Sequence, residues 1–137
     1  MAELAAVITA ASLGAMIFFS AVVAPVVFKV LPEVSAGQFL RALFPRYFLV
    51  NGLVAVVAGV IAWRALESVL LVASGVLLLL LRYVAVPIIN AARDAMLAGQ
   101  SGAASRFALW HRSSVVLNVG EMSMISAAVW LLLGGHQ

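Results

Sequence analysis

The sequence predicts an all-α protein, an integral membrane four-helix bundle. Of its 137 residues, 66% are hydrophobic and only 9% are charged, whereas about a quarter of the residues in a soluble domain are charged. Four apolar stretches each supply the roughly 20 residues that a helix needs to cross the bilayer core. Their apolar residues lie all round the helix axis, and no alternating ten-residue segments indicate a β-barrel. The length favours a single domain, residues 1–137.

The four helices are expected over residues 4–31, 45–63, 68–97 and 106–133. Pro32 ends the first helix, and Ser35 is a suitable N-cap for a short interfacial helix through Phe44, in the first connection. Pro45 then stands in the first turn of the second helix or kinks the chain there. The tight polar segment RALES leads into the third helix, and a loop rich in glycine and serine precedes the fourth.

Positively charged residues are shared unevenly between the connections. Three flank the first connection and three flank the third, whereas Arg64 alone flanks the second. Because Lys and Arg are enriched in cytoplasmic loops, this asymmetry predicts that the first and third connections are cytoplasmic and that both termini are outside. We expect a protein of the bacterial cytoplasmic (inner) membrane. No basic run with interleaved aromatic residues indicates a nucleic-acid partner.

Polar side chains from three helices fall at one depth when residues are counted from the outer helix ends. At about 1.5 Å per residue this depth is roughly 18 to 23 Å. Its members are Asn51, Arg82, Asn118 and Glu121. A charged side chain near the membrane centre costs roughly 2.5 to 3.5 kcal/mol on insertion scales, so a partner is expected. We therefore predict an ion pair between Arg82 and Glu121, with the guanidinium fork on the carboxylate.

A second polar group is expected at the cytoplasmic interface, about 33 Å from the outer helix ends. Its members are Arg46, Asn90, Arg93 and His111. On the fourth helix His111, Ser114, Asn118 and Glu121 are spaced 3, 4 and 3 residues apart, which draws one stripe along a helix face. We predict that the deeper group is the floor, and the interfacial group the mouth, of a cytoplasm-facing binding site. Ser114 is counted among its ligand-binding residues.

Other interpretations of these residues stay open. The Arg82–Glu121 pair also suits a structural clamp that fixes helix register. His111 also suits a helix-start histidine bonded to a loop carbonyl, a proton relay or a metal ligand. No second histidine shares its level, so a bis-histidine haem within one chain is disfavoured. Spacing alone leaves open a haem with Met16, Met122 or Met124 as the partner, and haem as a cofactor is disfavoured overall. Ser113 and Ser114 have no base positioned beside them, and no catalytic residue or metal site is expected.

Small and aromatic residues have structural interpretations. Ala55 and Gly59, with Gly52 one turn away, favour close packing of the second helix against a neighbour. Aromatic anchors at the membrane interfaces are expected at Tyr47, Trp63 and Trp110.

Several short stretches resemble one known family. They are VVAPVVF late in the first helix, LFPRYF opening the second, VPIINAARD closing the third and FALWHRSSVVLN opening the fourth. This pattern is similar to that of the small four-helix membrane family of unknown function typified by transmembrane protein 205, within the copper-resistance D-like group. The resemblance implies importance for Pro25, Pro45, Arg46, Pro87, Asn90, Arg93, His111 and Ser114.

The leading hypothesis is a membrane protein of undetermined activity, leaning away from an enzyme, that binds or conducts a small anionic or amphipathic ligand such as a lipid headgroup. A haem- or metal-associated redox protein, which the resemblance alone implies, is the first alternative. A non-catalytic assembly or scaffold protein in the lipid membrane is the second. Four short helices enclose little volume, so a transport pathway needs a homo-oligomer or a lipid-facing groove.

Overall fold

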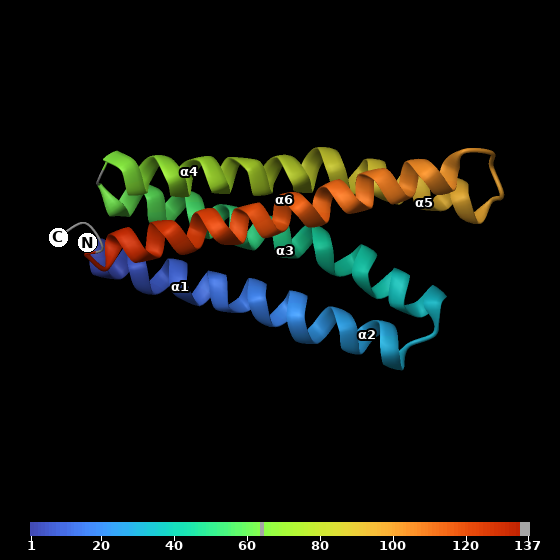
Figure 1. Cartoon of the computed structure of the whole chain (residues 1–137), viewed down its shortest axis with the longest axis horizontal. Coiled ribbons are helices and arrows are strands. Elements are labelled where there is room, and N and C mark those ends of the chain that lie inside the picture. Colours follow the sequence, from blue (N-terminus) through green and yellow to red (C-terminus); the bar gives the residue numbers. More distant parts are fainter. Residues whose placement is uncertain (64, 135–137) are drawn as a thin grey trace.

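The computed structural model describes residues 1–63 and 65–134, so Arg64 lies outside the described residues. The described residues form four long helical segments that run up and down in turn (Figure 1). Each segment is long and apolar enough to cross a membrane, which bears out the predicted all-α class with four membrane helices. The segments are Ala2–Val30, Glu33–Ala62, Leu66–Leu97 and Ala103–Leu132.

The first and third segments each contain one π-helical turn just before a proline. The first consists of α1 (Ala2–Phe18), η1 (Phe19–Val23) and α2 (Ala24–Val30), and the third of α4 (Ala65–Leu80), η2 (Leu81–Ala85) and α5 (Val86–Leu97). Pro25 and Pro87 follow the two π-turns at the same spacing. Proline has no N–H to donate and crowds the carbonyl of the preceding turn, and the helix widens there.

The second segment is one continuous helix, α3 (Glu33–Ala62), with Pro45 in its interior. The separate interfacial helix predicted before Pro45 is therefore wrong, because those residues belong to the same helix as the membrane-spanning part. An internal proline is tolerated where other donors satisfy the backbone that it disturbs. In the turn that precedes Pro45, Nη1 of Arg46 donates to the Ala42 carbonyl oxygen, 2.6 Å away.

Glycines let α3 and α4 approach each other closely. At Gly52 and Gly59 of α3, and at Gly75 of α4, an added Cβ would stand 3.1 Å or less from a backbone atom of the opposite helix. At Gly75 the backbone atom is the Gly52 carbonyl oxygen, at 2.7 Å. Close packing through small residues of the second helix is thus confirmed.

The fourth segment, α6 (Ala103–Leu132), returns the chain to the end of the bundle at which α1 begins (Figure 1). It follows a loop in which Gly99 and Gly102 have φ angles of 72° and 73°, a left-handed conformation that glycine adopts without strain. We call the half of the bundle nearer the α2–α3 and α5–α6 connections the basic half. Its cations are Lys29, Arg41, Arg46, Arg82, Arg93, Arg106 and Arg112, and its acids are Glu33 and Asp94.

The bundle is apolar both inside and outside. Its buried core is aromatic around Phe19 and Phe48, and rich in alanine nearer the chain ends. Large apolar side chains also cover the outer surface, with exposed fractions of 66% at Val7, 70% at Val116 and 62% at Trp130. A soluble monomer seldom exposes so continuous an apolar surface, whereas lipid covers it in a membrane.

Candidate functional site

Asn51 of α3 is buried and hydrogen-bonded on both sides of its amide. Its Oδ1 accepts from the Ser12 hydroxyl of α1 at 2.6 Å, and its Nδ2 donates to the Tyr47 carbonyl oxygen at 2.8 Å. Polar groups inside a membrane must find partners within the protein, and these two bonds supply them. Asn51 therefore ties α1 to α3.

Tyr47 lies in the interior rather than at an interface, so its predicted role as an interfacial anchor is wrong. Its ring packs against Phe19, Phe44 and Phe48 with centroid separations of 4.9 to 6.3 Å. Its hydroxyl donates to Oδ1 of Asn118 on α6, 3.0 Å away. A tyrosine flanked by phenylalanines suits an aromatic core as well as an interface, and the sequence pattern carries no signal that separates the two.

Glu121 of α6 is the most enclosed charged residue in the described chain, with an exposed fraction of 1%. Neither of its carboxyl oxygens has a hydrogen-bond partner. The hydroxyl of Ser74 on α4, with an exposed fraction of 0%, is close enough to interact with this carboxyl, yet it also makes no hydrogen bond of acceptable geometry. A buried carboxyl and a buried hydroxyl thus lie together without partners, which is rare in proteins.

The predicted ion pair between Arg82 and Glu121 is wrong, because neither Glu121 oxygen has a partner and Nε of Arg82 has none either. The half-buried Arg82 guanidinium instead lies 5.1 Å from the centroid of the Tyr83 ring. The error comes from the predicted start of the third membrane helix, which begins earlier than expected. Arg82 lies 17 residues from the start of α4 at Ala65, whereas Glu121 lies 11 residues from the end of α6 at Leu132. At about 1.5 Å per residue, the two side chains differ in depth by ~9 Å.

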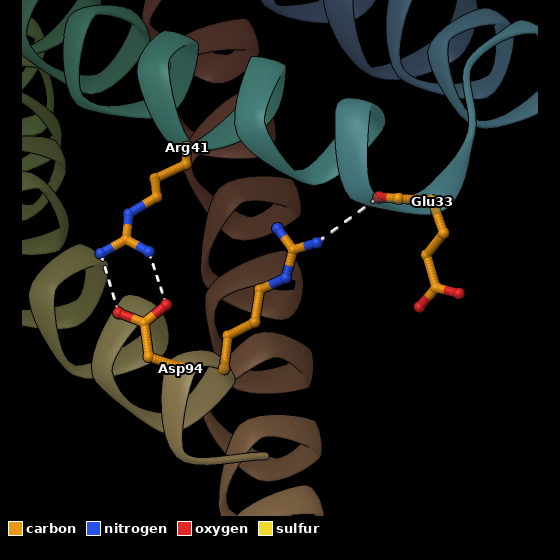
Figure 2. A network of polar contacts seen from close by, with 4 residues as sticks. Glu33, Arg41 and Asp94 are labelled. Carbon is orange, nitrogen blue, oxygen red and sulfur yellow. Dashed lines mark hydrogen bonds and ion pairs between the residues drawn. The ribbon is translucent and has the colours of Figure 1, made fainter. Parts of the chain in front are cut away.

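Two arginines of the basic half are held by contacts between α3 and α5 (Figure 2). Arg41 binds Asp94 through both guanidinium nitrogens, with N–O distances of 2.6 and 2.9 Å. Nη2 of Arg93 donates to the Glu33 carbonyl oxygen at 3.5 Å. The Arg93 guanidinium occupies the space that a Cβ would fill at Gly37, so this glycine makes room for it. These contacts join the start of α3 to the end of α5.

The remaining residues predicted for the mouth of the site are more open. His111 is exposed on α6 and stacks on Phe107, with 5.6 Å between ring centroids. Because α6 begins at Ala103, His111 lies in its third turn rather than at a helix start. The Ser114 hydroxyl donates to the His111 carbonyl oxygen at 2.8 Å. Arg46 is exposed, and Asn90 is half-buried.

Burial increases along the predicted stripe of α6. His111 is exposed, Ser114 and Asn118 are half-buried, and Glu121 is buried. The structure thus brings Asn118 and Asn51 into one neighbourhood through Tyr47, but it joins neither to Arg82.

Two other features bear on ligands. Among the described residues, no group of three or more His, Cys, Asp or Glu side chains lies together in an arrangement that could hold a metal ion. An open, mostly apolar groove of about 390 Å³ runs between α1 and α3. It is lined by Val7, Ile8, Ala11, Ser12, Ala15, Val50, Asn51 and Val54.

Four membrane-length helices, an apolar outer surface and polar side chains buried between the helices define a small integral membrane protein. The chain belongs to the family described as a domain of unknown function, DUF4149, which matches residues 7–98. The match covers the first three segments and leaves α6, with His111 and Glu121, outside it. Comparison with curated proteins and comparison with solved structures each found no significant match.

Proposed function

We propose that this membrane protein binds an anionic amphiphile, through a phosphate-type headgroup, at its basic half. The observation that carries the proposal is charge imbalance, since seven Lys and Arg residues face two acids in that half. Basic residues next to a membrane attract anionic lipid with about 1 kcal/mol per charge. The same asymmetry supports a cytoplasmic position for this half, with both termini outside.

The ion pairs of the basic half leave several of its Lys and Arg side chains available to bind a ligand. Arg41 is engaged by Asp94, and Arg93 lies against the backbone of α3. Among the described residues, Lys29, Arg106 and Arg112 are exposed and have no acidic partner within ion-pair distance. Guanidinium groups bind phosphate through two parallel hydrogen bonds, so the unpaired arginines are the best candidates for headgroup contact.

Apolar side chains beside these cations favour an amphiphile over a free anion. Phe28 and Leu109 are 61% and 65% exposed, next to Lys29 and within one helical turn of Arg106 and Arg112. An acyl chain covers such surface while its headgroup contacts the cations. The proposal therefore keeps the basic half, where the mouth of the site was predicted, but it assigns headgroup contact to cations other than the predicted Arg46 and Arg93. The predicted floor is not carried over, because Asn51 and Asn118 already have partners and Glu121 is enclosed.

The test measures lipid binding to the detergent-solubilised protein by native mass spectrometry. We expect phosphatidylglycerol to bind more tightly than phosphatidylcholine, and soluble glycerol phosphate to compete poorly. The double variant Arg106→Gln, Arg112→Gln should weaken phosphatidylglycerol binding by about 30-fold, the equivalent of ~2 kcal/mol for two charges.

The matched control is the charge-neutral double variant Arg41→Gln, Asp94→Asn, which removes an ion pair of the same half and should leave lipid binding unchanged. Equal affinity for the two lipids, or no loss in the Arg106 and Arg112 variant, would overturn the proposal. Strong competition by glycerol phosphate would identify a free phosphate compound as the ligand instead.

A further inference from the structure

The Glu121 carboxyl is a buried polar group for which the helical packing of the described residues provides no hydrogen-bond partner. Both of its oxygens and the Ser74 hydroxyl are buried without hydrogen bonds, although the nearby amides of Asn51 and Asn118 are bonded. A side chain placed between α6 and α4 at 1% exposure has no access to lipid headgroups or to bulk water. Its environment is therefore poor for a carboxylate anion.

Within residues 1–63 and 65–134, no cation forms an ion pair with Glu121. The helix α6 packs mainly against α1, α4, α5 and η2, and Tyr47 of α3 also contacts it through the hydrogen bond to Asn118. The ionisable residues of these elements and of α6 itself are Glu3, Glu67, Arg82, Tyr83, Arg93, Asp94, Arg106, His111 and Arg112. Of the cations among them, Arg82 is the nearest in depth, and it makes no hydrogen bond to Glu121. The others lie one to several helical turns further towards the basic half.

We propose that Glu121 and Ser74 form a proton-binding site inside the bundle, in which the Glu121 carboxyl carries the proton. A neutral carboxylic acid has one O–H donor to satisfy, and the Ser74 oxygen is the acceptor beside it. An ionised carboxylate would instead require several donors, and the described neighbours offer one hydroxyl. This site is independent of the lipid contacts proposed for the basic half.

The composition of the site favours a proton over a metal cation. Calcium and magnesium take six or more oxygen ligands, whereas Glu121 and Ser74 supply three side-chain oxygens. The backbone carbonyls of α4 and α6 around them are already used within the helices. A proton needs no coordination shell beyond one acceptor.

The stripe on α6 supplies a polar connection from this site to the basic half. Asn118 is three residues from Glu121 and therefore adjacent to it on the helix face. Ser114 and the exposed His111 continue the same face. Proton exchange is thus expected from the His111 side, since the buried side chains one helical turn from Ser74 and Glu121 towards the chain ends, Leu71 and Ile125, are apolar.

The experiment labels the protein in nanodiscs with dicyclohexylcarbodiimide, an apolar reagent that reacts with protonated carboxyl groups in membranes. The acid proton moves to a carbodiimide nitrogen while the carboxyl oxygen adds to the central carbon. Peptide mass spectrometry of the unmodified chain should locate the label at Glu121 and not at the water-exposed Glu33 or Asp94. Once Glu121 ionises at high pH, the labelling rate should fall about tenfold per pH unit.

Control variants and added sodium distinguish a proton site at Glu121 from a metal-cation site and from an ionised carboxylate. Glu121→Gln should abolish the label and remove a protonated-carboxyl C=O band from the infrared spectrum, while Glu67→Gln, at the other buried carboxyl of the described chain, should leave both unchanged. Labelling that is unaffected by added sodium supports a proton site. Protection by sodium, absence of label at Glu121 in the unmodified chain, or an infrared spectrum without the protonated band would overturn the proposal.

Discussion

The close approach of α3 and α4 at Gly75 gives the sharpest stability prediction. A Cβ added at Gly75 would stand 2.7 Å from the Gly52 carbonyl oxygen and 2.9 Å from the Val56 backbone nitrogen. Both atoms belong to the backbone of α3, so no side-chain rotation relieves the overlap. Gly75→Ala should therefore force α3 and α4 apart.

The size of the effect follows from these distances. Ordinary contact begins near 3.4 Å, so the helices must separate by about 0.5 to 0.7 Å at this point. A gap of that size forfeits a quarter to a half of the dispersion energy of each contact across it. Overpacking of this kind costs about 1 to 3 kcal/mol, which lowers the ratio of folded to unfolded protein by roughly 5- to 150-fold.

The assay is equilibrium unfolding in mixed micelles of a mild detergent and dodecyl sulfate, monitored by circular dichroism. Gly14→Ala is the matched control, since it also replaces a glycine within a helix, but the added Cβ meets nothing within 4 Å. It should leave stability unchanged or raise it by up to about 1 kcal/mol. Gly52→Ala, with its nearest contact at 3.0 Å, should fall between them. Equal stability of the Gly75 and Gly14 variants would refute the close packing of α3 on α4.

Three further predictions follow from the polar contacts and the charge asymmetry. Tyr47→Phe should lower the free energy of unfolding by about 0.6 and at most ~1.7 kcal/mol, because the hydrogen bond to Asn118 is lost. The control Tyr83→Phe should leave the free energy of unfolding unchanged, and equal effects of the two variants would contradict the hydrogen bond. Gly37→Ala should expel the Arg93 guanidinium and speed its modification by phenylglyoxal, and an unchanged rate would count against the contact. A C-terminal alkaline phosphatase fusion should be active, and activity from a cytoplasm-specific reporter at that end would contradict the orientation.

The sequence was sufficient to predict the helices because membrane crossing imposes length and apolarity on each of them. It was less informative about where they begin. Pro45 looked like a boundary, yet the structure absorbs it inside α3. The third and fourth helices each begin three residues earlier than expected, at Ala65 and Ala103. The polar residues before an apolar stretch do not reveal whether they belong to the first turn of the helix or to the loop before it.

Small errors in helix ends changed the predicted site more than the predicted fold. Three extra residues at the start of α4 move Arg82 about 5 Å further from the outer helix end, which is enough to separate it from Glu121. The π-turn η2, which contains Arg82, adds a rotation that a count at 100° per residue does not include. The hydrogen bond from Tyr47 to Asn118 depends on which side of α3 faces α6, and nearly uniform apolarity leaves that side unmarked.

The polar residues of the bundle thus divide into those whose partners are within the fold and those whose partners are not. Asn51, Asn118 and Arg41 are held by other helices, and their contacts account for helix register without any ligand. Glu121 contributes nothing of that kind, since a carboxyl without partners costs stability wherever it is buried. An apolar residue at position 121 would be cheaper for folding alone. Proton exchange at the carboxyl explains why a residue that lowers the free energy of unfolding stands at this position. A Glu121→Leu variant that kept the proton exchange of the unmodified protein would remove that explanation.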